Sequence, residues 1–191
     1  MLSLLRFTNI VSGQILYDGI DITKVPRHRL RQSVTMIPQE ATLFSGSVRS
    51  NLDPTGFVSQ ERIERVFNSC KGISSLSKNK SSDETTVHGS HGRCQDLSLS
   101  SEVDPRGGNF SHGQRQVLSL CRALIRNSML MLLDEATASM DYQADQGIQE
   151  VLRKELGIAR RDRTLVTIAH RPRTIMDYDS VVVMGGGRVI E

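Results

Sequence analysis

The sequence of 191 residues predicts an α/β fold built around a parallel sheet. Two apolar runs, at 129–134 and 164–169, have the length and composition of strands that are buried on both faces. Amphipathic helices are expected before and after the first run, at 113–127 and at about 143–156. Strands and helices that alternate in this order are typical of a parallel sheet, whose ligands bind beyond the carboxyl ends of the strands.

The first forty residues predict shorter elements. Residues 1–7, MLSLLRF, are expected to form part of an amphipathic helix. The stretch GQILYDGIDI (13–22) alternates apolar and polar residues, and its Asp-Gly pair predicts a tight turn between two surface strands. The stretch VTMIPQ (34–39) predicts a short strand that its proline ends, which leaves Gln39 at the carboxyl end.

The middle and the end of the chain predict three further features. The stretch SQERIERVFNSC (59–70) has apolar residues every three or four positions, which indicates a helix. From about 77 to 108 this periodicity disappears and serine, glycine and charged residues predominate, so we expect a mobile insertion there. The last twelve residues, SVVVMGGGRVIE, predict a hairpin around a glycine-rich turn.

Composition excludes several classes of function. The formal net charge of +3 is small and dispersed, and aromatic residues make up only 4% of the chain, so we expect no nucleic-acid partner. Three irregularly spaced cysteines indicate reduced thiols and not a disulfide framework. No apolar run approaches the ~18 residues of a membrane span, so we expect that the chain does not itself cross a membrane. His88, His91 and Cys94 lack a fourth ligand in register and are not expected to bind metal.

Two adjacent carboxylates, Asp134 and Glu135, follow the first buried strand. Asp134 could hold Mg²⁺ through water while Glu135 polarises an attacking water as a general base. Alternatively, the two acids could simply favour the N-terminus of a following helix. Gln39 and His170 also follow predicted strands, and His170 could donate a hydrogen bond to a phosphate. The four side chains are therefore expected to meet at one edge of the sheet.

The start of the helix predicted at 113–127 offers a second candidate site. Ser111, His112, Gly113 and Gln114 could bind an anion through a hydroxyl group and the N–H groups of the first helical turn. A plain serine N-cap explains the same residues, and the residue types alone favour it. Asp141, a few residues beyond the acidic pair, could be a helix cap or part of a turn.

Taken together, these motifs resemble the nucleotide-binding domain of ATP-binding cassette (ABC) transporters. IPQE (37–40) resembles the Q-loop, FSHGQ (110–114) the signature motif, LMLLDEA (130–136) the Walker B strand, SMD (139–141) the D-loop and IAHR (168–171) the H-loop. The resemblance covers nearly the whole chain outside 77–108 and implies one partial cassette over 1–191. Its finer texture is similar to the C-terminal cassette of subfamily C, the multidrug-resistance-protein type.

The resemblance implies a P-loop NTPase (RecA-like) parallel sheet with a helical signature subdomain, and the cofactors ATP and Mg²⁺. It also implies two partners, a second cassette bound head to tail and the transmembrane domains of an exporter at whose cytoplasmic face the chain would lie. The implied roles are catalysis by Glu135 and His170, contact with ATP by Gln39, Ser111, His112, Gly113, Gln114 and Asp141, and Mg²⁺ binding by Asp134 and Gln39.

The sequence departs from the family pattern in its signature motif and at the phosphate loop. His112 replaces a glycine or small residue, Phe110 replaces leucine, and Met140 replaces a small aliphatic residue. No G-x-x-x-x-G-K-[ST] pattern occurs in the 191 residues. We therefore expect an N-terminally incomplete fold that begins just after this loop, and impaired ATP hydrolysis by the chain alone.

Two other functions fit part of the pattern. The chain could be a non-hydrolysing regulatory module that supplies only its signature half-site to another cassette. It could also belong to the DNA-repair or chromosome ATPases, which share these motifs. Those proteins carry a long coiled coil between the phosphate loop and the signature motif. Here 72 positions separate Gln39 from Ser111 and show no sustained heptads, which argues against that class.

Overall fold

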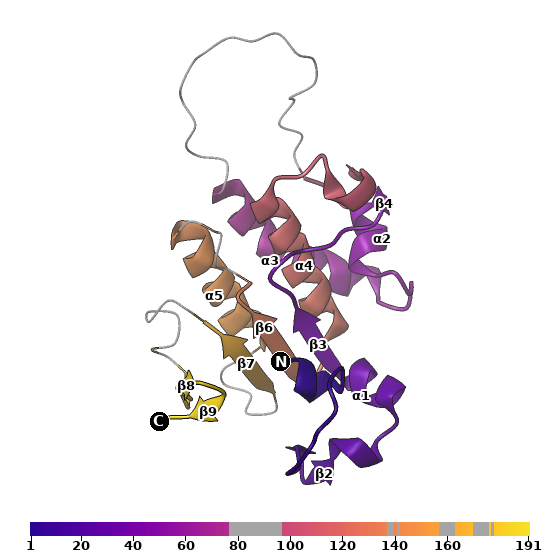
Figure 1. Ribbon diagram of the computed structural model, residues 1–191. Helices are drawn as coiled ribbons and strands as arrows, with labels where there is room; N and C mark the ends of the chain where they lie inside the picture. Colours follow the sequence, from indigo (N-terminus) through magenta and orange to yellow (C-terminus); the bar gives the residue numbers. More distant parts are fainter. Residues whose placement is uncertain (77–96, 137–139, 141, 157–162, 170–175, 177) are drawn as a thin grey trace.

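A parallel sheet forms the centre of the computed structural model, which describes residues 1–76, 97–136, 140, 142–156, 163–169, 176 and 178–191 (Figure 1). Among these residues the sheet has three strands in the order β3-β6-β7. Both strand pairs are parallel, which confirms the predicted fold class. The strands are β3 (Val34–Ile37), β6 (Leu130–Asp134) and β7 (Thr164–Ile168).

The register of the sheet places three strand ends at one edge. Ile37 of β3 pairs with Leu133 of β6, and Asp134 of β6 pairs with Ile168 of β7. The residues that follow these strands therefore emerge side by side. This alignment is what the sequence predicted for Gln39 and for the acidic pair.

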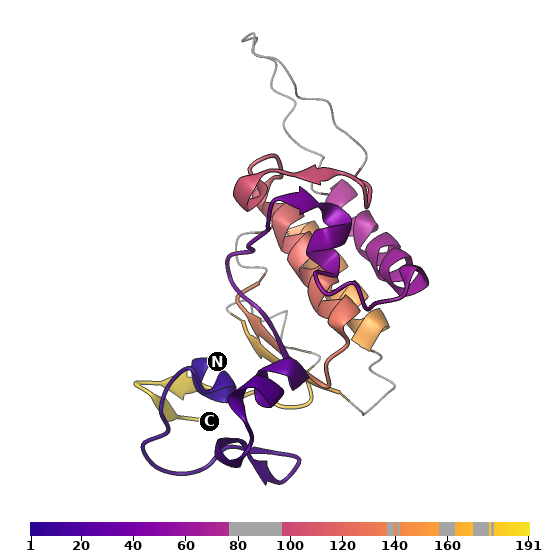
Figure 2. The ribbon, with the colours of Figure 1, turned by 90° about the vertical axis from the view of Figure 1, so that its right-hand side faces the viewer.

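Helices cover one face of the sheet and pack on one another (Figures 1 and 2). Helix α4 contacts strand β3 and the three other helices of this layer. Its apolar positions are spaced as an amphipathic helix requires. They form the middle of the larger of two apolar cores, the one built from this helical layer and the sheet face beneath it. The helices are α2 (Val48–Leu52), α3 (Gln60–Leu76), α4 (His112–Arg126) and α5 (Tyr142–Leu156).

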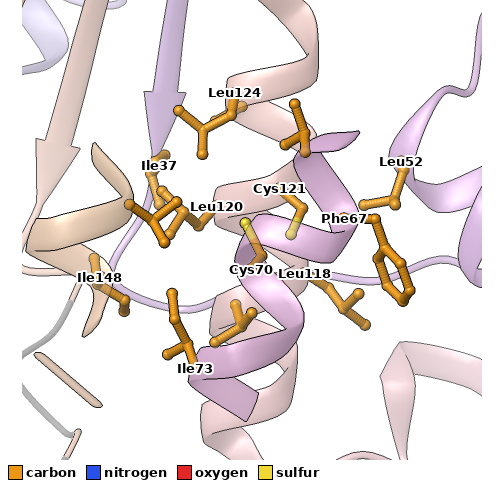
Figure 3. Packing of buried hydrophobic residues seen from close by; sticks show 14 of the residues in the cluster. Ile37, Leu52, Phe67, Cys70, Ile73, Leu118, Leu120, Cys121, Leu124 and Ile148 are labelled. Atoms are coloured by element: carbon orange, nitrogen blue, oxygen red, sulfur yellow. The ribbon is translucent and has the colours of Figure 1, made fainter. Parts of the chain in front are cut away.

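The contact between α3 and α4 is apolar and contains two free thiols. Cys70 of α3 and Cys121 of α4 are buried beside Leu120 and Ile73 (Figure 3). Burial, together with the neighbouring Cys70, raises the pKa of the Cys121 thiol, so the protonated form is favoured. Both cysteines behave as small apolar residues of the core, and the third, Cys94, lies outside the described residues.

A smaller core covers the other face of the sheet. Leu132 of β6 is fully buried in it, whereas its neighbours Met131 and Leu133 belong to the larger core, as the alternation of side chains along a strand requires. Strand β6 is therefore buried on both faces. The elements on this side are η1 (Leu2–Leu5), β1 (Leu16–Tyr17), β2 (Ile20–Asp21), η2 (Ile22–Lys24) and α1 (Arg27–Ser33).

The hairpin predicted from the Asp-Gly pair is confirmed, and the helix predicted for residues 1–7 is corrected. Strands β1 and β2 are antiparallel, with Asp18 at φ 49° and Gly19 at φ 77°, the conformation that a two-residue hairpin turn needs. Residues 2–5 form only a short 3₁₀ helix, because Arg6 adopts a left-handed conformation at φ 54° and ends it. The side chain of Arg6 donates to the carbonyl oxygens of Ile22 and Val25, at 3.0 and 2.7 Å.

The expected insertion does not extend to residue 108. Leu97 and Val103 are buried in the larger core, and β5 (Glu102–Val103) pairs with β4 (Gly46–Ser47), followed by the short helix η3 (Pro105–Gly107). Residues 77–96 lie outside the described residues. The two-residue strand is too short to show any periodicity, so the sequence did not reveal it.

The predicted burial of 164–169 is also wrong in part. Val166 and Ile168 of β7 are 36% and 39% exposed. In the described sheet β7 pairs with β6 only, and its outer side chains lack the cover that β6 has. The C-terminal hairpin is confirmed: β8 (Met184–Gly185) pairs with β9 (Arg188–Val189) around two glycines at positive φ.

A polar cluster joins α4 to the segment that follows β3. Arg122 of α4 donates to the carbonyl oxygens of Asn51 and Thr42, at 2.7 and 3.0 Å, and to Asn51 Oδ1 at 3.1 Å. The Asn51 amide, only 1% exposed, donates to the carbonyl oxygens of Phe44 and Ser47 and accepts from the Phe44 N–H. Burial lowers the pKa of the Arg122 guanidinium, and these hydrogen bonds replace the water that it loses.

This cluster makes Asn51 a test of the fold. Replacing Asn51 by Ala removes the partners of buried backbone groups and of Arg122, so we expect the free energy of unfolding to fall by about 3 kcal/mol. Urea unfolding followed by circular dichroism measures this change. The matched control is Asn109→Ala, which removes two exposed hydrogen bonds to the backbone and should cost about 1 kcal/mol or less. Equal losses for the two variants would contradict the buried cluster.

Candidate functional site

The shared edge of the sheet brings two of the predicted site residues into contact. Gln39 follows β3, Glu135 follows β6, and the Gln39 amide Nε2 donates to Glu135 Oε2 at 3.1 Å. Residues that are 96 positions apart in the sequence thus meet beyond the carboxyl ends of two parallel strands. The Gln39 side chain is exposed and that of Glu135 is half-buried, so a ligand can reach both.

Glu135 has an unusual backbone conformation. Its φ of 48° is left-handed, and its N–H donates to the carbonyl oxygen of Ile168 in β7 at 3.3 Å. For a residue with a β-carbon this conformation costs about 1 to 3 kcal/mol; it occurs in turns, as at Asp18, and also recurs at functional sites. The turn at Glu135 takes the chain out of β6 at the point where the side chain meets Gln39. Sequence patterns carry no signal for it.

Asp134 completes a small group of oxygen ligands. It is the last residue of β6 and is half-buried beside Glu135. No group of three or more His, Cys, Asp or Glu residues that could hold a metal alone occurs in the described part of the chain. The Asp134 carboxylate and the Gln39 amide oxygen do fit Mg²⁺, which commonly takes one or two protein ligands and completes its shell with water and phosphate oxygens.

The second candidate site is the start of α4, where the structure shows a capping box. Ser111 Oγ accepts from the Gln114 N–H at 3.1 Å, and Gln114 Oε1 accepts from the Ser111 N–H at 2.9 Å. The plain N-cap that the residue types favoured is therefore confirmed. Ser111 and His112 are exposed and Gly113 is half-buried. The cap uses Ser111 Oγ as an acceptor and leaves its hydroxyl proton able to point outward to an anion.

A buried glutamine, which the sequence analysis missed, joins these two candidate sites. Gln116 of α4 is 1% exposed, and its Nε2 donates to the carbonyl oxygen of Pro38 at 3.1 Å. Its Oε1 is buried and has no hydrogen-bond partner among the described residues, which costs about 1 to 3 kcal/mol. A signal was present in the sequence, because Gln116, Leu120 and Leu124 follow the four-residue spacing of one helical face.

Two of the predicted site residues cannot be placed. His170 and Asp141 both lie outside the described residues. Met140, next to Asp141, is buried in the larger core, and Phe110, two residues before α4, is itself partly buried and packs against that core. Among the residues that the structure describes, no helix has the length and apolar character needed to cross a membrane.

Comparison with known proteins gives consistent results. The family model described as "ABC transporter" matches residues 1–138. The chain is 43% identical over 189 residues to the "Pleiotropic ABC efflux transporter of multiple drugs YBT1" of Candida glabrata. This match covers 99% of this chain and 11% of that protein. It is 42% identical over 197 residues to the "ATP-dependent bile acid permease" of Saccharomyces cerevisiae, with coverage of 99% and 11%.

A human relative and a solved structure extend the comparison. The chain is 42% identical over 188 residues to human "ATP-binding cassette sub-family C member 2", with coverage of 98% of this chain and 11% of that protein. The solved structure of a bacterial Atm1-family ABC exporter with ATP bound matches with a TM-score of 0.79 at 29% identity, covering 100% of this chain and 30% of that one. The chain thus spans about a tenth of the length of the yeast and human relatives.

The fold agrees with these matches. A parallel sheet whose strand ends present Gln39, Asp134 and Glu135, with a helical layer that begins at Ser111, is the arrangement that the family pattern predicts. The family model covers more than half of the chain, and the relatives include exporters of subfamily C. The chain belongs to the ABC transporter family, and its sequence is that of the P-loop NTPase nucleotide-binding domain of subfamily C exporters.

Proposed function

We propose that this chain is the ATP-hydrolysing cassette of an exporter and couples ATP hydrolysis to transport across a membrane. The observation that carries the proposal is the hydrogen bond between Gln39 and Glu135 beyond the carboxyl ends of β3 and β6. Ligands of open parallel sheets bind at this edge. The ATP in the related Atm1-family structure, and the transport named for the yeast relatives, support ATP as the ligand and export as the outcome.

The proposed chemistry assigns a role to each side chain at the sheet edge. Glu135 accepts a proton from the water that attacks the γ-phosphate, and its half-buried position favours a directed contact over free rotation. Gln39 holds the Glu135 carboxylate by donating to Oε2, and together with Asp134 it would hold Mg²⁺, which would supply positive charge to neutralise the phosphates. His170 donates a hydrogen bond to the γ-phosphate.

The start of α4 is proposed to serve a second ATP. In a head-to-tail dimer of cassettes, Ser111, His112, Gly113 and Gln114 contact the nucleotide that the partner cassette holds, and Asp141 lines the same interface. The exposed Ser111 hydroxyl and the positive end of the α4 dipole favour a phosphate there. This assignment implies two partners, a second cassette and transmembrane domains, and a position at the cytoplasmic face of the membrane.

A second function has one observation in its favour. The signature motif lies at the start of α4, where this chain's own residues form the complete capping box. The chain could therefore act as a regulatory module that supplies only this half-site and hydrolyses nothing. The role of Glu135 separates the two functions, because only the first requires its carboxylate.

A chimera tests hydrolysis directly. Residues 1–191 would replace the aligned segment of the S. cerevisiae bile acid permease, whose remaining chain supplies the other parts of a transporter. We expect ATP-dependent bile acid uptake into membrane vesicles, and we expect Glu135→Gln to lower the rate at least about 100-fold because the general base is lost. The matched control is Glu150→Gln, which changes an exposed carboxylate on α5 and should leave uptake unchanged. Equal uptake by the Glu135→Gln variant and the unsubstituted chimera would reject the hydrolytic role.

The isolated chain gives the second prediction. The purified 191-residue protein should hydrolyse ATP no faster than its Glu135→Gln variant, because it has no phosphate-loop pattern to hold the nucleotide. Release of inorganic phosphate measures the rate. A rate that depends on Glu135 would contradict this impairment and would mean that other residues bind the phosphates.

The half-site gives the third prediction. ATP-dependent association of this chain with a complete cassette, measured by analytical ultracentrifugation, should be abolished by Ser111→Arg, since the larger side chain fills the space of the phosphate. Ser98→Arg, at an exposed loop position, serves as the control. Association that is unaffected by Ser111→Arg would exclude the signature contact from both functions.

A further inference from the structure

We propose that Gln116 is a positioning residue: from within α4 it fixes the peptide that precedes Gln39, and so couples the start of the signature helix to the Gln39–Glu135 pair of the same chain. The inference rests on the proposed function for its effect on catalysis. Its structural part stands on two hydrogen bonds of 3.1 Å, from Gln116 to Pro38 and from Gln39 to Glu135.

The contact at Pro38 has a defined chemistry. The carbonyl oxygen of Pro38 can only accept a hydrogen bond, so the atom facing it must be the Gln116 NH₂ group. Gln116 is 1% exposed, and water therefore does not compete for this bond. The same orientation leaves Oε1 buried and without a partner among the described residues. An apolar side chain of similar length would avoid this unsatisfied oxygen, so packing alone does not favour a glutamine here.

Geometry carries the effect from Pro38 to Gln39. The Pro38 carbonyl and the Gln39 N–H belong to one planar peptide unit, and the proline ring restricts the backbone before it. The main remaining rotation of this unit turns the Pro38 carbonyl away from Gln116. The hydrogen bond opposes that rotation and therefore fixes the direction in which Gln39 leaves the strand end. From that position the Gln39 amide reaches Glu135.

Attachment of the loop to α4 does not depend on Gln116. Arg122, six residues later on the same helix, already holds the segment through the carbonyl oxygens of Thr42 and Asn51. The Gln116 bond adds a constraint only at the Pro38–Gln39 peptide. This location distinguishes a positioning role from a general role in stability.

A rigid helix connects this constraint to the start of α4. Gln116 lies two residues after Gln114, whose side chain and N–H form the capping box with Ser111. These residues are part of one continuous α-helix, so a displacement of its first turn also displaces Gln116. Contact of a partner's nucleotide with Ser111 would thereby reach Gln39 through one hydrogen bond and Glu135 through a second.

The structural part is tested by NMR on the ¹⁵N-labelled 191-residue chain. The variant Gln116→Met removes the donor and keeps the length of the side chain, and we expect it to shift the Gln39 side-chain amide signal toward those of exposed glutamines. Glu135→Ala should produce the same shift. The matched control, Ser128→Ala, breaks a buried 2.6 Å hydrogen bond with Thr35, toward the other end of β3 from Gln39, and should leave the signal in place. An unmoved Gln39 signal in Gln116→Met would overturn the proposal, and Gln116→Leu repeats the test if the methionine variant fails to fold.

The functional part is tested by a double-mutant cycle in the permease chimera. Gln116→Met should lower kcat for ATP hydrolysis about tenfold without changing KM, because a misplaced catalytic group costs rate and not binding. In a Gln39→Ala background the same substitution should cause no further loss, whereas additive losses would contradict action through Gln39. If the proposed function is wrong, Glu135→Gln will leave the uptake rate of the chimera unchanged. The NMR experiment then still decides whether Gln116 positions Gln39.

Discussion

The hydrogen bonds that α4 donates to the segment after β3 are the constraint on which the site depends. From Pro38 to Ser45 the backbone belongs to no helix or strand, and α2 ends just after Asn51, so carbonyl groups of this segment need other partners. Gln116 and Arg122 supply partners at three points, the carbonyls of Pro38, Thr42 and Asn51. Because the apolar side of α4 is held in the larger core, these polar side chains act from a fixed position. The helix therefore defines the path of the loop, including the place where Gln39 begins it.

The strand ends and the signature helix consequently form one mechanical unit. Strand β6 is buried on both faces and fixes Asp134 and Glu135, while β3 and α4 together fix Gln39. Two local costs are retained at this junction, the left-handed backbone of Glu135 and the unsatisfied Oε1 of Gln116. Each accompanies a hydrogen bond at this junction, from the Glu135 N–H to Ile168 and from Gln116 to Pro38, and both lie within two residues of a contact between proposed site residues. A site that must hold a water and a metal in a fixed relation to a phosphate gains from such rigidity.

The sequence predicts those features of the fold that depend on local pattern. The Asp-Gly hairpin, the face of α3 around Cys70, the burial of β6 and the meeting of Gln39 with Glu135 follow from periodicity and from strand direction. Features that depend on single long-range polar contacts were missed. Asn51 and Gln116 are buried polar residues, and their distant partners, Arg122 for Asn51 and Pro38 for Gln116, follow from no local pattern, although the spacing of Gln116 with Leu120 and Leu124 did indicate its burial. The exposed side chains of β7 were missed because an apolar run predicts a strand but not what lies beside it.

The S-x-x-Q spacing of the signature motif illustrates how structure and function share residues. Ser111 and Gln114 are three positions apart, which is what a reciprocal capping box needs, so the motif alone indicates only that a helix starts there. The cap also removes two N–H groups from the set available to an anion, and it fixes the Ser111 oxygen at the helix end. What distinguishes this helix start from an ordinary one is its continuation to Gln116 and the Pro38 carbonyl, next to the residue that contacts Glu135. Functional meaning therefore comes from the connection of α4 to the strand ends, and the same four motif residues at the start of an unconnected helix would be a cap and nothing more.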